Sequence, residues 1–303
     1  MSTSISTGET KGVFNYLDPA SLSSGEKPWS KADTQAFKSF SELPVSYAVH
    51  DIRASPELSN PDLAGFSFHS SPSSVPVDEV LSSGLAEGTQ TRKDYYAEIE
   101  AAIKQQLGAK DVVIWDHTMR VRDPSSARQP VQSVHVDQTP SAALRRMKQH
   151  APQFAADVEN GRRFQLVNVW RPLGPALDHP LGLLDARSVA PEDLIAVDLL
   201  YPKVYERGKE VLPSPESLRS REGYEPRGET YRVVPKEGHK WWYVKDMKSD
   251  EVVFIKCYDS EGETEPNGRK GVATSSPHSA FEDPAVQNPP PRKSVEVRCL
   301  VFY

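Results

Sequence analysis

The chain has 303 residues, a formal net charge of −6 at pH 7 and a sequence pI of about 5.8. This acidic balance argues against a nucleic-acid partner, because proteins that bind phosphate backbones usually carry a basic domain or stripe. Two cysteines are too few for a disulfide framework, no apolar run approaches the roughly 20 residues that span a bilayer, and no leading segment resembles a signal peptide, so we expect a cytoplasmic protein without a membrane contact.

Short apolar pieces separated by Ser, Pro and Gly make up residues 1–90, and we expect them to wrap the core. Residues 92–108 follow with an apolar stripe and a closing glycine, which is typical of an amphipathic helix that ends at a C′ glycine. The stripe consists of Tyr95, Ile99, Ile103 and Leu107. A second helix is expected over residues 141–161, with Ser141 as its N-cap.

Strand patterns dominate after residue 110. We expect strands at residues 111–122, 130–137, 164–170, 194–201, 230–234, 240–245, 252–258 and 295–302. With helices before this region and in one excursion within it, the order predicts a mainly β fold with flanking helices, a β-sandwich or jelly roll. Such folds often reach about 200–250 residues as one unit, so we expect one domain. Residues 1–110 would be its N-terminal wrapping and helical segment, and residues 111–303 its core.

His135 and Asp137 lie at the end of a segment that alternates like a strand and stops at Thr139-Pro140. In an extended segment, residues two apart point to the same face, so this imidazole and this carboxylate can reach the same ion. The pair supplies two of the three ligands of the 2-His-1-carboxylate set found in non-haem Fe(II) oxygenases. A strand histidine that faces solvent is the alternative interpretation.

The third ligand is expected to be a histidine far along the chain, because three ligands on one face of an ion require a second strand beside the first. His239 and His278 are the two late candidates. His278 precedes a Pro-rich connector and an alternating terminal strand. One face of that strand carries Arg292, Ser294, Glu296 and Arg298. An inward arginine there suits a dicarboxylate that chelates the metal at one end and needs a planar bidentate cation at the other, which favours His278.

At this point the sequence resembles the fungal hydroxylase/desaturase family of Fe(II)/2-oxoglutarate-dependent oxygenases. The resemblance rests on His135-Val-Asp137, Asn168-Val-Trp-Arg-Pro172, Lys240-Trp-Trp-Tyr243, Phe254-Ile-Lys-Cys-Tyr-Asp259 and the segment from Ser276-Pro-His278 to Arg298. It spans nearly the whole chain and implies a single catalytic domain over residues 1–303 with a double-stranded β-helix (jelly roll, cupin-like). It also implies Fe(II), 2-oxoglutarate and O2 as cofactors. The implied reaction is hydroxylation, desaturation or oxidative cyclisation of a small specialised or amino-acid-derived metabolite, with release of succinate and CO2.

The resemblance also implies residue roles. His135, Asp137 and His278 would bind the metal. Arg292 and Ser294 resemble the Arg-x-Ser pair that holds the distal carboxylate of 2-oxoglutarate, with the serine hydroxyl as second donor. The interval from His278 to Arg292 is longer than is usual in plant-type relatives, which keeps Arg298 as a competitor for this role.

Asn168 and Arg171 are further candidates to reach the co-substrate, although Trp170-Arg171-Pro172 could simply end a strand. Two other functions stay open. A cupin-like metal-dependent lyase or isomerase would use the same three ligands without 2-oxoglutarate, and the arginines of the terminal strand would then be dispensable. A non-catalytic ligand-binding pathway protein would not need these ligand types at these positions. The oligomeric state is open, and a homo-oligomer is compatible with the sequence.

Overall fold

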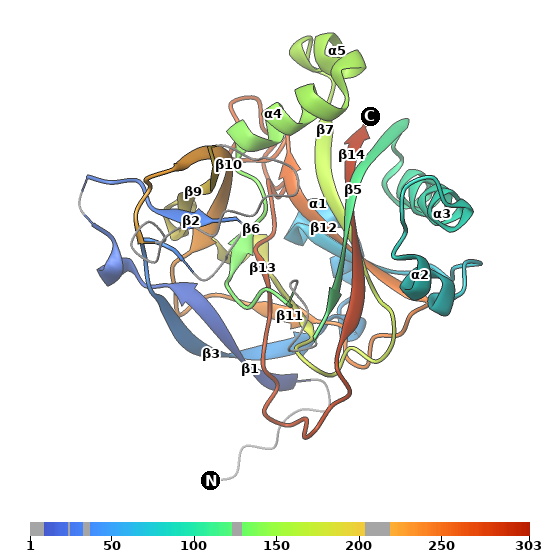
Figure 1. Ribbon diagram of the computed structural model, residues 1–303, viewed down its shortest axis with the longest axis horizontal. Helices are drawn as coiled ribbons and strands as arrows, with labels where there is room; N and C mark the ends of the chain where they lie inside the picture. The colour runs from blue at the N-terminus through green and yellow to red at the C-terminus, as the bar shows by residue number, and fades with distance from the viewer. Residues whose placement is uncertain (1–8, 24, 33–36, 123–128, 204–218) are drawn as a thin grey trace.

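The computed structural model describes residues 9–303 apart from 24, 33–36, 123–128 and 204–218 (Figure 1). Its strands are β1 (Glu9–Leu17), β2 (Trp29–Lys31), β3 (Glu42–Asp51), β4 (Phe66–Ser70), β5 (Asp111–Val121), β6 (His135–Val136), β7 (Phe164–Pro172), β8 (Leu181–Leu184), β9 (Leu194–Pro202), β10 (Tyr224–Val233), β11 (Trp241–Tyr243), β12 (Glu251–Asp259), β13 (His278–Ala280) and β14 (Lys293–Phe302). Its α-helices are α1 (Pro61–Ala64), α2 (Val77–Ser83), α3 (Gln90–Leu107), α4 (Pro140–His150) and α5 (Ala155–Glu159). Among these described helices, none is long and apolar enough to cross a membrane.

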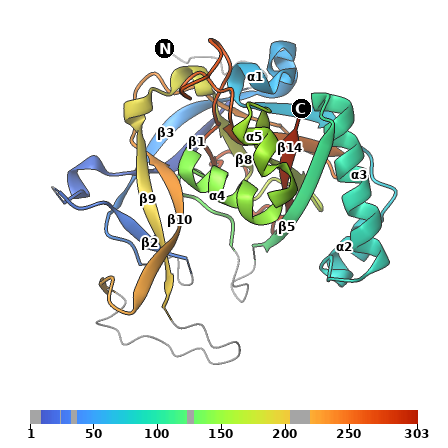
Figure 2. The ribbon, with the colours of Figure 1, turned by 90° about the horizontal axis from the view of Figure 1, so that it is seen from above.

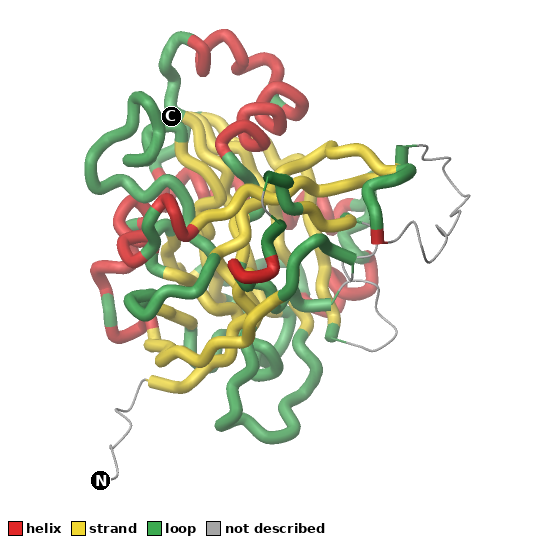
Figure 3. The backbone as a smooth tube through the Cα atoms, turned by 90° about the vertical axis from the view of Figure 1, so that its left-hand side faces the viewer, coloured by secondary structure: helices red, strands yellow, loops and turns green. Residues whose placement is uncertain are grey.

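The strands form two sheets, with the strands at the centre of the molecule and the helices at its periphery (Figure 3). One sheet has the order β4-β12-β7-β14-β5, and the other contains the run β11-β8-β13-β6. From β5 to β8 and again from β11 to β14, consecutive strands alternate between the two sheets. This exchange is the winding of a jelly roll. The predicted mainly β fold with flanking helices, a double-stranded β-helix, is therefore confirmed.

Two additions extend the sheet that contains β6. At one end β11 pairs with β3, which pairs with β1 over its whole length. At the other end the long β9–β10 hairpin pairs with β6 and continues into β2 (Figure 2). The N-terminal residues therefore contribute strands to the sheet, which their Ser- and Pro-rich sequence does not indicate. The β9–β10 hairpin places a strand directly beside β6.

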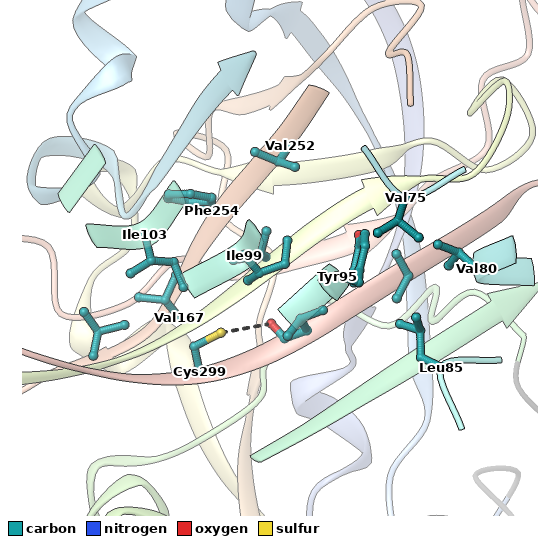
Figure 4. Close-up of a cluster of buried hydrophobic side chains, with 14 of the residues drawn as sticks. Val75, Val80, Leu85, Tyr95, Ile99, Ile103, Val167, Val252, Phe254 and Cys299 are labelled. Atoms are coloured by element: carbon teal, nitrogen blue, oxygen red, sulfur yellow. Dashed lines mark hydrogen bonds between the residues drawn. The ribbon is translucent and has the colours of Figure 1, made fainter. Parts of the chain in front are cut away.

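Helix α3 covers the outer face of the five-stranded sheet. Its buried side chains Tyr95, Ile99 and Ile103 pack against strand residues such as Val167 and Phe254 (Figure 4). The helix ends at Gly108, which adopts a φ of +69° and donates its backbone N–H to Lys104. The predicted helix over residues 92–108 is thus confirmed, together with its terminating glycine.

The helix predicted over residues 141–161 is divided. Helix α4 ends at His150, and α5 begins after a 3-10 turn that starts at Pro152. The N-cap of α4 is Thr139 rather than Ser141, because Pro140 fits the first helical position and the Thr139 hydroxyl accepts the Ala142 N–H at 3.3 Å. The prediction of Ser141 as the cap was wrong, because the cap lies two residues earlier. Pro152 explains the break between the two helices.

A buried ion cluster joins the ends of β7 and β12. Lys256, which is 1% exposed, donates to Asp259 at 2.7 Å and to Asp62 at 2.6 Å. Arg163 and Gln165 also donate to Asp259. Burial alone would raise the pKa of Asp259, but the hydrogen bond from Arg163 and the charge of Lys256 hold that pKa at about 2.

Replacing Asp259 with asparagine is expected to lower the free energy of unfolding by about 3 kcal/mol, because Lys256 then loses a buried counter-charge. The pKa of Asp259 is depressed in the folded state, so its contribution is present above the ordinary aspartate pKa and is lost as pH falls toward 2. Urea denaturation at pH 7 measures the loss of stability. The same measurement at lower pH should show that the free energy of unfolding falls less steeply with pH in the variant than in the unaltered protein. Asp157→Asn, at an exposed ion pair with Arg162, is the control and should change stability by less than about 1 kcal/mol.

Candidate metal centre

Neighbouring strands bring the two candidate histidines together. His135 on β6 and His278 on β13 are direct partners in an antiparallel pair, and their ring centroids lie 4.5 Å apart. Asp137 follows β6, and its Oδ1 lies 3.4 Å from the Nε2 of His135. One ligand atom from each of the three residues can be chosen so that all lie within 4.8 Å of one another. The three residues form a group that could hold a metal ion.

Backbone contacts orient both imidazoles. The Nδ1 of His135 lies 2.8 Å from the carbonyl oxygen of Ser133, and the Nδ1 of His278 lies 3.2 Å from that of Ser276. In the neutral ring, an Nδ1–H group donates a hydrogen bond to the carbonyl oxygen, and Nε2 then carries the lone pair that can bind a metal. Burial lowers the pKa of His278, which keeps this ring in the neutral form that binds metals.

Asp137 is held as a carboxylate. Burial opposes its ionisation, but the neighbouring groups, His135 and Arg298 foremost, hold its pKa well below the ordinary value. Asn168 on β7 donates its Nδ2 to the Oδ2 of Asp137 at 2.7 Å, and the Nε of Arg298 lies 3.9 Å from the same oxygen. One carboxylate oxygen is therefore engaged by the opposite sheet, while the other faces His135.

The two arginines of the terminal strand have different surroundings. Arg298 donates to Asp116 at 2.8 Å and to Glu296 at 3.1 Å, so its guanidinium is occupied by carboxylates of this chain. Arg292 is 2% exposed, and within the described residues it has no ion pair. Its Nη1 donates to the carbonyl oxygen of His179, and its Nε is buried without a partner.

Arg292 is thus a buried cation with unused donor capacity. Its guanidinium lies 5.5 Å from the centroid of the Trp170 ring, and Ser294 follows it on the same strand face, also buried. Burial, together with the charge of Arg120, lowers the pKa of Arg292 to about 9, so the side chain is still charged at neutral pH. Burying a cation without a counter-charge is costly, and an anionic ligand would offset that cost.

The structure does not bring Arg171 to this group. On β7, Asn168 points toward Asp137, whereas Arg171 lies an odd number of residues away and faces α3, with its guanidinium 5.4 Å from the Tyr95 ring. Side-chain alternation along a strand explains the difference, because a shift by an odd number of residues reverses the face.

Arg232 is a further residue of this region that was not predicted from the sequence. It lies on β10 directly opposite His135, so it continues the row that His278 and His135 form across the sheet. Its Nε is buried without a partner, and the charges of Glu42 and Asp137 act on it. The strand predicted over residues 230–234 contains Arg232 and corresponds to the end of β10. No local signal shows that this strand, inserted between β8 and β11, pairs with β6.

A cavity of about 570 Å³ is lined by residues next in sequence to Asp137 and His278, and its walls do not include the three residues themselves. Its walls include Gln138, next to Asp137, and Pro277, next to His278. The remaining wall is mixed in character, with Val272, Leu194, Tyr231 and Glu265 among its residues. This volume lies within the range of cavities that bind small organic molecules.

Comparisons with known proteins agree with this geometry. A family model described as "Oxidoreductase/YMDC permease-like domain" matches residues 14–302. The Fe(II)/2-oxoglutarate-dependent dioxygenase nvfI of Aspergillus novofumigatus is 32% identical over 279 residues, which cover 89% of this chain and 86% of the relative. The hydroxylase/desaturase efuI of Hormonema carpetanum is 30% identical over 277 residues, covering 84% of this chain and 82% of the relative.

A solved structure of the iron and alpha-ketoglutarate-dependent endoperoxidase NvfI matches with a TM-score of 0.79 and 28% identity, and the match covers 99% of both chains. Its fold is the jelly roll described above. The relatives from fungi thus include a dioxygenase named for its dependence on Fe(II) and 2-oxoglutarate, and a hydroxylase/desaturase. The chain belongs to this family of fungal Fe(II)/2-oxoglutarate-dependent dioxygenases and, like them, uses Fe(II), 2-oxoglutarate and O2.

Proposed function

We propose that His135, Asp137 and His278 are the iron ligands of this dioxygenase. The observation that carries the proposal is the convergence of their ligand atoms within 4.8 Å. Two neutral imidazole nitrogens and one carboxylate oxygen match the ligand set of non-haem Fe(II) oxygenases, in which the other metal positions are open. When bound there, Fe(II) together with 2-oxoglutarate and O2 supplies the oxidant, and 2-oxoglutarate leaves as succinate and CO2.

Arg292 is proposed to bind the distal carboxylate of 2-oxoglutarate, with the hydroxyl of Ser294 as a further donor. The supporting observations are its burial, its unused Nε donor and the lack of an ion pair to it among the described residues. A guanidinium offers two parallel N–H groups to a carboxylate, which fixes the orientation of the ligand as well as its charge. Arg298 is already paired with Asp116 and Glu296, so we assign it to the support of Asp137 instead.

The substrate is proposed to be a small molecule that binds in the cavity of about 570 Å³ beside Gln138 and Pro277. The enzyme's task toward it is to aim one C–H bond at the metal and to exclude competing reactions. Hydroxylation, desaturation and cyclisation differ in how the substrate carbon is placed. The proposal includes a single catalytic domain and a cytosolic setting, in which the buried thiols of Cys257 and Cys299 stay reduced.

Formation of succinate tests the proposed function. The purified protein, supplied with Fe(II), 2-oxoglutarate and air, is expected to form succinate slowly even without its substrate. Chelation of the iron should stop the reaction, and Asp137→Ala should show none. Succinate formation that persists in Asp137→Ala would contradict the assigned ligands.

Replacing Asn168 with alanine is expected to weaken Fe(II) binding by about 10–100-fold, because an outer partner that orients a ligating carboxylate usually contributes this much. The variant loses the 2.7 Å hydrogen bond to Asp137 Oδ2. Equilibrium dialysis under argon measures the iron affinity. Asn160→Ala, at an exposed position after α5, is the matched control and should bind iron like the unaltered protein.

A further inference from the structure

A second cavity lies on the opposite side of the five-stranded sheet from the metal centre. Its volume is about 160 Å³, and its walls include Arg171, Tyr95, Leu173, Val75 and Ser73. Figure 4 shows Tyr95 next to Val75 in the buried hydrophobic cluster between α3 and the five-stranded sheet. Arg171 is only 2% exposed, although it sits beside an apolar cluster. The cavity therefore places a charged side chain deep in the protein.

The donors of this cavity are largely unused. The Nη2 of Arg171 donates to Ser71 Oγ at 3.3 Å, while its Nε and Nη1 are buried without partners. The hydroxyl of Tyr95 is also buried without a partner. Buried polar groups are nearly always hydrogen-bonded, so unpartnered donors on adjoining side chains of one cavity indicate a missing acceptor.

No carboxylate among the described residues neutralises Arg171 directly. Glu98 is near enough to be affected by its charge, but the carboxylate of Glu98 is engaged by Ser73 Oγ at 2.6 Å and by the Ser74 N–H at 2.8 Å. Asp250 lies at the rim of the cavity and is exposed. A buried cation that lacks a counter-ion is strongly disfavoured, which makes an external anion favourable here.

We propose that this cavity is a binding site for a small oxyanion, with Arg171 and Tyr95 as its main donors. The volume equals that of roughly five liquid waters, which accommodates a carboxylate or a tetrahedral anion. Guanidinium groups match both shapes through paired N–H groups. The proposal does not depend on the assignment of Arg292, because Arg171 lies on the α3 side of the five-stranded sheet, whereas Arg292 lies against Trp170 on the other side.

Calorimetric titration of the full chain with inorganic phosphate, sulfate and acetate in a low-salt buffer tests the site. Arg292→Gln separates it from the co-substrate site, since that variant should keep the binding. Arg171→Gln should weaken the binding of the preferred anion by about tenfold or more, and Tyr95→Phe should weaken it several-fold. Arg227→Gln, at an exposed pair with Glu225, is the control and should leave the affinity unchanged.

Equal affinity in Arg171→Gln and the unaltered protein would overturn the proposal, as would loss of all anion binding in Arg292→Gln. The absence of measurable binding by any of the three anions would overturn it as well. If Arg171→Gln does not fold, Tyr95→Phe and Ser71→Ala decide the matter. Unchanged affinity in both would then contradict the site, and weaker binding in either would support it.

Discussion

Alanine in place of His278 is expected to weaken Fe(II) binding by more than about 100-fold and to abolish the formation of succinate. The reason is that the variant removes a ligand itself, whereas loss of an outer partner already costs about 10–100-fold. The remaining His135 and Asp137 would hold the ion by two atoms. Iron binding is measured by anaerobic dialysis and succinate by chromatography, at equal protein concentration and with the folded fraction determined by circular dichroism.

His239→Gln is the matched comparison for this result. His239 is the other late histidine, but it is buried among aromatic residues, with Nδ1 3.0 Å from the hydroxyl of Tyr16. Its replacement should lower stability and leave the iron affinity of the folded protein unchanged. If His278→Ala binds iron as tightly as the unaltered protein, or if His239→Gln is the variant that loses iron, the ligand assignment is wrong.

Glutamine in place of Arg292 is expected to raise the KM for 2-oxoglutarate by about 30-fold or more. Truncating one partner of a buried charge pair usually costs about 2–5 kcal/mol, and the lower limit corresponds to this factor. Lysine at this position should give an intermediate KM, because its ammonium is a point charge and lacks the paired N–H groups of a guanidinium. The measurement is the 2-oxoglutarate dependence of succinate formation at saturating iron.

Stability gives an independent readout for Arg292. In the ligand-free protein, removal of a buried cation without an ion pair should leave the free energy of unfolding unchanged or raise it. Stabilisation by added 2-oxoglutarate should be lost. Arg227→Gln, at the surface, should behave like the unaltered protein in both assays. An unchanged KM in Arg292→Gln would mean that another cation, such as Arg232 opposite His135, binds the co-substrate.

Local patterns in the sequence predicted the helices and strands whose apolar side chains recur with the period of that element. The apolar stripe before Gly108 lies on α3, and β5, β7, β9, β11, β12 and β14 lie within a few residues of their predicted positions. Strand β10 begins six residues before the predicted strand at 230–234, and of the strand predicted over 130–137 only β6 (His135–Val136) forms. The short strands β8 and β13 were not predicted, because a few residues contain too little periodicity. Strands β1 and β3 were missed for another reason. They are held by pairing with each other and with β11, and such long-range contacts leave no local signal.

The candidate site was predicted in part. His135 and Asp137 followed from strand alternation, and the structure places His278 beside them. The same alternation, applied from Asn168, would have put Arg171 on the outer face of β7. Arg232 could not be found in this way, since its position beside His135 depends on which strands pair. Local spacing predicts residues that share a strand, whereas neighbours across a sheet require the topology.

An anaerobic titration of the metal-free protein with Fe(II), followed by 2-oxoglutarate, tests the central claim most directly. We expect a visible metal-to-ligand charge-transfer band that appears only after both additions. The band should be absent in His135→Ala and should need a much higher 2-oxoglutarate concentration in Arg292→Gln. Iron binding without any such band, or a band that persists in His135→Ala, would contradict the proposed metal centre and its chelated co-substrate.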